Sequence, residues 1–91
     1  MLKDFSRYAA SGEINSEVAD QAGTTAKVKS IYSERPGVTL DELDGLTVMG
    51  DDWWFNIRPS NTEPLLRLNV EAATPGQMAA IRDEVLGLVR G

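Results

Sequence analysis

The sequence contains no cysteine and no histidine among its 91 residues. It therefore has no disulfide, no thiol nucleophile, no imidazole base and none of the usual zinc ligands. No apolar run approaches the roughly 20 residues that a membrane span needs. The first ten residues, MLKDFSRYAA, also lack the long apolar stretch of a targeting segment, so a cytoplasmic location is expected.

Positive charge is scarce as well. The sequence has nine lysines and arginines and 14 aspartates and glutamates, which gives a net charge of −5. A surface of this sign should repel nucleic acid and anionic membrane, so neither is an expected partner. Any anionic ligand must be held by a local cluster of donors. The length and the 42% hydrophobic content are those of one globular domain with a modest core.

Two segments predict helices. Apolar residues recur at helical spacing from about residue 22 to 35, and Pro36-Gly37 ends the pattern because proline disfavours helical geometry in the residue before it. At residues 74 to 77, TPGQ is a helix start in which Thr74 caps the backbone and Gln77 completes a capping box. A helix from about 75 to 90 follows, with an apolar stripe of Met78, Ile81, Val85 and Leu88.

Four segments predict strands. GEINSEV at residues 12 to 18 alternates weakly, and residues 40 to 57 indicate β structure with turns at Asp44-Gly45 and Gly50-Asp51. One strand follows each of these turns, and another begins at Leu65. The order strand, helix, three strands, helix predicts an α+β fold, in which two helices pack on one face of a mainly antiparallel four-stranded sheet.

Alternation along the last two strands separates a core face from an open face. The predicted core residues are Trp53, Phe55, Ile57, Leu66, Leu68 and Val70. The opposite face would carry Trp54, Asn56 and Arg58 on one strand, and Leu65, Arg67, Asn69 and Glu71 on the other. If the two strands are neighbours, Arg58 and Arg67 should lie close together.

The connection between these strands, in the stretch IRPSNTEPLL at residues 57 to 66, is rich in hydrogen-bonding groups. In a tight turn its backbone N–H groups can converge on an anion, and Arg58 adds a planar fork that suits phosphate. Pro59 and Pro64 reduce the number of conformations that the loop can adopt before it binds a ligand. A phosphate monoester fits this set of donors, in which Ser60, Asn61, Thr62 and Glu63 would supply four successive N–H groups and the first three also side-chain donors.

Simpler interpretations stay open on composition alone. The loop could be a turn whose side chains satisfy their own backbone. Trp54 could stack on a sugar or belong to the core, and Asp51-Asp52 is more typical of a turn than of a metal site. Arg67 could pair with Glu63 or Glu71 as well as with a ligand.

The stretch DDWWFNIRPSNTEPLLRLNVEA resembles the phosphate-binding signature of the α-D-phosphohexomutases, which act as phosphomannomutase and phosphoglucomutase. SGEIN at residues 11 to 15 is similar to the start of the C-terminal domain in the phosphomannomutase branch. The resemblance runs from about residue 8 to 89. It implies a TATA-box-binding-protein-like domain at residues 12 to 91, preceded by a linker or hinge remnant at residues 1 to 11.

Members of that family have four domains around one cleft: the first bears a phosphoserine, the second binds Mg²⁺, the third reads the sugar hydroxyls and the fourth grips the substrate phosphate. The resemblance implies that this chain is the fourth domain, with the other three as partners. It implies phosphate contacts for Arg58, Ser60, Asn61 and Thr62, with Glu63 and Arg67 shaping the loop.

The family's phosphoserine, metal and sugar-reading segments are absent from the sequence. No catalytic or metal-binding residue is therefore expected in this chain, and Mg²⁺ is implied for another domain of the parent enzyme. The chain alone should bind a mannose or glucose phosphate weakly and catalyse nothing. The alternative is a small non-enzymatic domain that binds a protein partner through Trp54 and Leu65.

Overall fold

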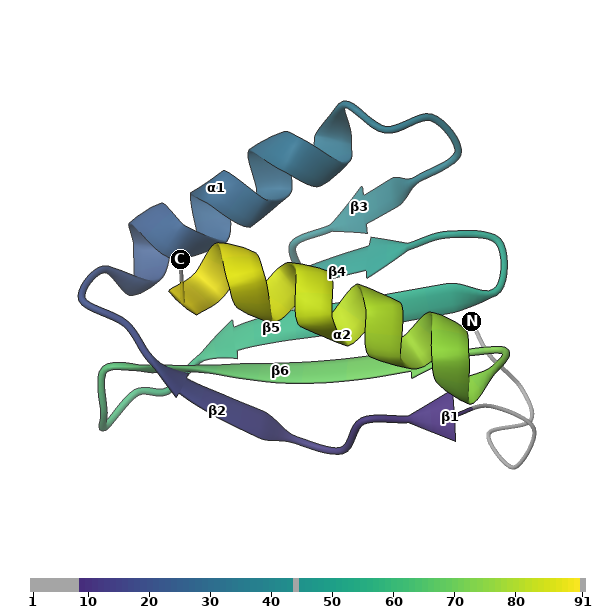
Figure 1. Ribbon diagram of the computed structural model, residues 1–91. Coiled ribbons are helices and arrows are strands. Elements are labelled where there is room, and N and C mark those ends of the chain that lie inside the picture. Colours follow the sequence, from purple (N-terminus) through teal and green to yellow (C-terminus); the bar gives the residue numbers. More distant parts are fainter. Residues whose placement is uncertain (1–8, 44, 91) are drawn as a thin grey trace.

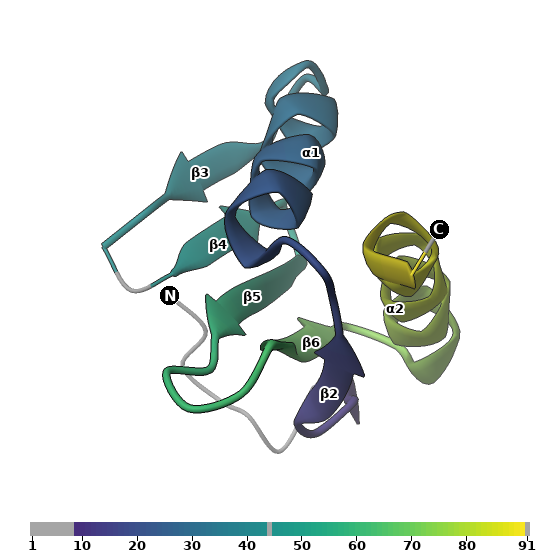
Figure 2. The ribbon, with the colours of Figure 1, turned by 90° about the vertical axis from the view of Figure 1, so that its left-hand side faces the viewer.

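The computed structural model of the chain describes residues 9–43 and 45–90, which form one antiparallel sheet with two helices on one of its faces (Figure 1 and Figure 2). The predicted α+β class is confirmed. The elements in chain order are β1 (Ala9–Ala10), β2 (Ile14–Glu17), α1 (Gln21–Ser33), β3 (Thr39–Asp41), β4 (Leu46–Met49), β5 (Trp53–Pro59), β6 (Leu65–Ala72) and α2 (Pro75–Arg90). The four predicted strands correspond to β2, β4, β5 and β6, and the structure adds the short β1 and β3.

The sheet has the order β1-β6-β5-β4-β3, and β2 also pairs with β6. β1 and β2 therefore follow one another along the same edge of β6 (Figure 1). Between them, Ser11 keeps the pairing intact, because its N–H donates to the Val70 carbonyl at 2.9 Å and its hydroxyl accepts from the Val70 N–H at 3.0 Å. Of the predicted linker, residues 1–8 lie outside the described residues.

Both helices begin with side-chain caps. Asp20 accepts a hydrogen bond from the Gly23 N–H at 2.9 Å, which starts α1 close to the predicted position. The predicted cap of α2 is confirmed, since the Thr74 hydroxyl accepts from the Gln77 N–H at 3.1 Å. The Gln77 side chain reaches back one residue further than a standard capping box, to the Ala73 N–H at 3.3 Å.

The core lies between the helices and the sheet. Five of the six predicted core residues are buried, and the sixth, Trp53, is partly buried and stacks on Phe55 with ring centroids 6.2 Å apart. Among residues 9–43 and 45–90, no helix is long and apolar enough to cross a membrane.

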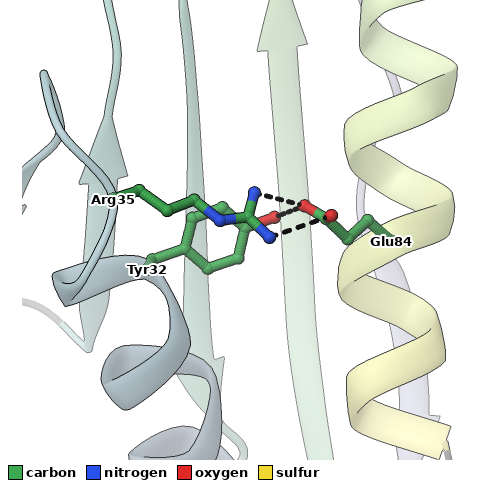
Figure 3. Close-up of polar contacts among 3 residues, drawn as sticks. All are labelled: Tyr32, Arg35 and Glu84. Atoms are coloured by element: carbon green, nitrogen blue, oxygen red, sulfur yellow. Dashed lines mark hydrogen bonds and ion pairs between the residues drawn. The ribbon is translucent and has the colours of Figure 1, made fainter.

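A polar cluster ties the two helices together beside this core (Figure 3). The Tyr32 hydroxyl donates to the Glu84 carboxylate, and Arg35 forms two hydrogen bonds to the same carboxylate at 2.8 and 3.0 Å. The Arg35 guanidinium also lies 4.4 Å from the centre of the Tyr32 ring. The bonds from Arg35 and then Tyr32 lower the pKa of Glu84, whereas burial and the neighbouring carboxylate raise the pKa of Tyr32.

Candidate functional site

Two arginines face each other where β5 and β6 approach their connecting loop. Arg58 and Arg67 are directly opposite in the register of the two strands, which confirms that they are neighbours. The buried pair next to them, Ile57 and Leu68, points into the core, so the arginines belong to the face that the helices leave open. Like charges directly opposite each other destabilise a sheet. An anion bound between them would offset that cost.

These arginines border a polar hollow of about 500 Å³. It lies at the end of the sheet where the 60–64 loop joins β5 to β6, a loop that can be followed in Figure 2. All four residues for which the resemblance implies phosphate contact line this hollow. Its complete lining is Gly45, Arg58, Pro59, Ser60, Asn61, Thr62 and Arg67. Glu63 does not line it, and Arg67 does.

Gly45 is a lining residue that sequence reasoning assigned only to a turn. Its φ of 71° lies in the left-handed region, where glycine carries no steric penalty. A Cβ at this position would collide with the Ile57 carbonyl oxygen and lie 2.7 Å from Arg58 Cγ. Glycine is therefore needed for the β3–β4 turn to approach the backbone of Arg58. The other residue of the predicted turn, Asp44, lies outside the described residues.

Some of the backbone N–H groups of the loop form hydrogen bonds within the loop or to the start of β6. The Ser60 N–H donates to the Leu65 carbonyl at 3.0 Å, so the expectation of four outward N–H groups is wrong for Ser60. The Thr62 N–H makes a long bond, 3.4 Å, to the hydroxyl of Ser60, a residue only 8% exposed. In the described part of the chain, the N–H groups of Asn61 and Glu63 have no hydrogen-bond partner. Of these two N–H groups, that of Asn61 belongs to a residue that lines the hollow, and the N–H of Thr62, which also lines it, is held only weakly.

Gln21, at the start of α1, contacts the loop, and the sequence did not predict this contact. Its side-chain amide nitrogen lies 3.1 Å from the Ser60 carbonyl oxygen, 3.1 Å from that of Glu63 and 2.7 Å from that of Leu65. In the sequence, Gln21 is one polar residue next to a predicted helix, and no local pattern relates it to a loop 39 residues away.

Other expectations for this region had mixed outcomes. Arg67 pairs neither with Glu63 nor with Glu71: its Nε lies 3.9 Å from Glu13, a long ion pair. Trp54 is on the open face but does not line the hollow. Asp52 accepts a hydrogen bond from the Gln77 side chain at 3.0 Å.

The described residues contain no cluster of side chains that could coordinate a metal ion. Within residues 9–43 and 45–90, no group of three or more acidic, histidine or cysteine residues could hold a metal ion. The donors that meet at the hollow are N–H groups, hydroxyls, an amide and guanidinium groups, which bind anions. The fold and this site define a small α+β domain with a hollow at one end of its sheet that is lined by hydrogen-bond donors.

Comparison with known proteins agrees with that class. Residues 13–88 match the family described as phosphoglucomutase/phosphomannomutase, C-terminal domain, and the chain belongs to this family. It is 45% identical over 87 residues to a phosphomannomutase of Methanocaldococcus jannaschii, which covers 96% of this chain and 19% of that protein.

Two bacterial relatives match the chain over 65 and 86 residues. A phosphomannomutase of Salmonella typhimurium is 48% identical over 65 residues, 71% of this chain and 14% of that protein. A protein of Xanthomonas campestris named phosphohexose mutases is 41% identical over 86 residues, 93% of this chain and 19% of that protein. The chain thus spans about a fifth or less of the length of these relatives.

Proposed function

We propose that this chain is the substrate-phosphate-binding domain of a phosphohexomutase, an enzyme that interconverts hexose 6-phosphates and hexose 1-phosphates. The observation that carries the proposal is the directly opposed pair Arg58 and Arg67, which lines the hollow. On a chain of net charge −5, two guanidinium groups held opposite each other next to the N–H group of Asn61 favour an anion at this site. Membership of the family supports phosphate as that anion.

Five of the seven lining residues supply charge or donors to the phosphate in this proposal. Arg58 supplies a planar pair of donors to two phosphate oxygens, and Arg67 adds positive charge from the opposite strand. Asn61 contributes its N–H and its side-chain amide, and Thr62 contributes its hydroxyl. The Ser60 hydroxyl accepts from Thr62 and still has its own proton to donate.

In the parent enzyme the phosphoserine of another domain transfers its phosphoryl group to the sugar. The resulting bisphosphate turns over in the cleft and returns its other phosphate to the serine. A site that reads only phosphate can hold either end of the sugar, which this reorientation requires. It contributes positioning and uniform binding, with the chemistry carried out elsewhere. Membership of the family supports a parent enzyme in which another domain holds Mg²⁺.

The chain by itself should bind a phosphosugar weakly and catalyse nothing. One phosphate site without the other three domains corresponds to a dissociation constant of about 1 mM, or roughly −4 kcal/mol. Mannose 1-phosphate and inorganic phosphate should bind alike, because this site makes its contacts to the phosphate.

A ¹H–¹⁵N NMR titration tests the proposal. Mannose 1-phosphate and inorganic phosphate should both shift the amide signals of Arg58 and of residues 60 to 63, and mannose should shift none of them. Shifts that follow mannose, or no shifts at millimolar phosphate, would contradict the proposal. Shifts at Trp54 and Leu65 that depend on protein concentration and ignore phosphate would favour a protein-interaction domain.

The variant Arg58→Ala should weaken phosphate binding by about 1.5 to 3 kcal/mol, because a charge-assisted bond is lost. Arg82→Ala is the matched control, since it removes the same charge from the helix layer, where Arg82 pairs with its neighbour Asp83. An equal loss in both variants would mean that net charge alone governs binding.

A further inference from the structure

The loop that lines the hollow is joined to the start of α1 by the side chain of Gln21, and its Pro64 carbonyl accepts a further hydrogen bond from the Val18 N–H at 2.9 Å. The amide nitrogen of Gln21 carries two hydrogens and lies within 2.7 to 3.1 Å of three loop carbonyl oxygens, so at least one hydrogen is shared. These carbonyls belong to Ser60 and Glu63, near the two ends of the loop, and to Leu65, the first residue of β6. One donor therefore closes the loop against the start of α1.

The bond to Ser60 also sets the direction of an N–H group. A trans peptide is planar, and its carbonyl and its N–H point in opposite directions. The carbonyl of Ser60 and the N–H of Asn61 belong to one such peptide, and none of the described peptides is cis. Because Gln21 draws the Ser60 carbonyl toward α1, the Asn61 N–H points away from Gln21. That N–H has no hydrogen-bond partner among the described residues, and Asn61 lines the hollow.

Gln21 is itself fixed. It lies next to the cap residue Asp20, and its carbonyl accepts both from the helix and from the Thr25 hydroxyl at 2.8 Å. A side chain anchored in the first turn of a packed helix positions a loop better than another loop would. A loop ordered before binding also loses less conformational freedom when its ligand arrives.

We propose that Gln21 is a positioning residue of the phosphate site, which orders the 60–64 loop and turns the Asn61 N–H toward the bound phosphate. This inference rests on the proposed function, because it requires that the hollow bind phosphate. It adds a residue from outside the signature stretch and links the start of α1 to the site.

The variant Gln21→Met tests the inference, because methionine has a similar length and no donor. Without phosphate, the NMR order parameters of Asn61 and Thr62 should fall from about 0.85 toward 0.6. The affinity for inorganic phosphate should fall about fivefold to tenfold. The matched control is Gln77→Met, which removes a glutamine in the first turn of α2 that makes no contact with the loop. It should leave the order parameters and the affinity unchanged.

A second variant, Gln21→Lys, keeps the inference testable if the Gln21→Met protein does not fold. In Gln21→Lys the ammonium group offers three donors to the three carbonyls, so the loop should stay as ordered as in the wild type. Only loop order is compared here, because the added charge changes phosphate affinity directly. A loop that is disordered in Gln21→Lys would overturn the inference.

Failure of the inference and failure of the proposed function give different results. If the wild-type chain binds no phosphate, the proposed function falls and the inference falls with it. If the wild type binds phosphate and Gln21→Met binds it equally well, only the inference is wrong. An equal loss of affinity in Gln21→Met and Gln77→Met would also overturn it, because general destabilisation would then explain both.

Discussion

The Tyr32 hydroxyl donates a hydrogen bond to the Glu84 carboxylate, so a buried ring of α1 is joined to a half-exposed carboxylate of α2. Arg35 binds the same carboxylate, and its guanidinium lies over the Tyr32 ring (Figure 3). The helices cover the core face, and α1 carries Gln21 at its other end. The cluster therefore helps to fix the helix that anchors the loop.

The variant Glu84→Ala should lower the free energy of unfolding by about 1 to 2 kcal/mol. The buried Tyr32 hydroxyl loses its acceptor, and Arg35 loses its partner. The ion pair itself adds little, since both side chains are more than 40% exposed. Urea unfolding measures the change. Asp83→Ala, the adjacent carboxylate on α2, should change stability by less than about 0.5 kcal/mol.

The same cluster should make stability depend on pH. The pKa of Glu84 is below its ordinary value of 4.5 in the folded protein, so the unfolded chain binds this proton more readily. The Glu84 contribution is therefore fully present above about pH 4.5 and is lost as pH falls through the lowered pKa.

The stability difference between wild type and Glu84→Gln should thus shrink between pH 5 and about pH 3. Glu71 acts in the opposite direction, because burial raises its pKa, but its effect is common to both proteins and cancels in the difference. A difference that stays constant over this range would show that the charge of Glu84 is not what stabilises the cluster.

Alanine variants of three glycines can distinguish the cost of a left-handed backbone from the cost of steric crowding at Gly45. Gly45→Ala should cost at least about 2 kcal/mol, because it combines a left-handed φ with a collision against Ile57 and Arg58. Gly12→Ala has the same φ of 71° with nothing nearby, and should cost about 1 kcal/mol. Gly87→Ala, inside α2 with open space around it, should stabilise by roughly 0.5 to 1 kcal/mol. Thermal unfolding of the three variants checks this order.

Phosphate should stabilise the folded chain. With a dissociation constant of about 1 mM, about 10 mM phosphate should add about 1.4 kcal/mol to the free energy of unfolding. Sodium chloride at equal ionic strength is the control. The increment should decrease as salt is raised, because these charges lie at the surface and are screened.

The variant Arg67→Ala should distinguish the repulsion between Arg67 and Arg58 from the contribution of Arg67 to phosphate binding. Without phosphate its stability should stay within about 0.5 kcal/mol of the wild type, since the lost packing is offset by relief of the repulsion from Arg58. The increment that phosphate adds should be smaller than in the wild type. A full increment in this variant would exclude Arg67 from the site.

Local sequence signals were sufficient for most elements of the fold. The cap and the apolar stripe predicted α2 with the bounds that the structure has, and period-2 alternation predicted the core face of β5 and β6. β1 and β3 were not counted among the strands, because two- and three-residue segments are too short to display a period. Their pairing is decided by the neighbouring strand.

The sequence by itself determined that Arg58 and Arg67 share the open face, because side-chain direction along a strand follows from residue number once the strands are paired. It also determined which loop residues could bind an anion, since donor groups are a property of the side chains. Only the tertiary structure decided which donors remain for a ligand. The Leu65 carbonyl uses the Ser60 N–H, Gly45 approaches Arg58 from another hairpin, and Gln21 holds the loop from 39 residues away. The Ser60 bond closes the loop locally, whereas the contacts of Gly45 and Gln21 depend on how separate elements pack, and no local pattern in the chain encodes them.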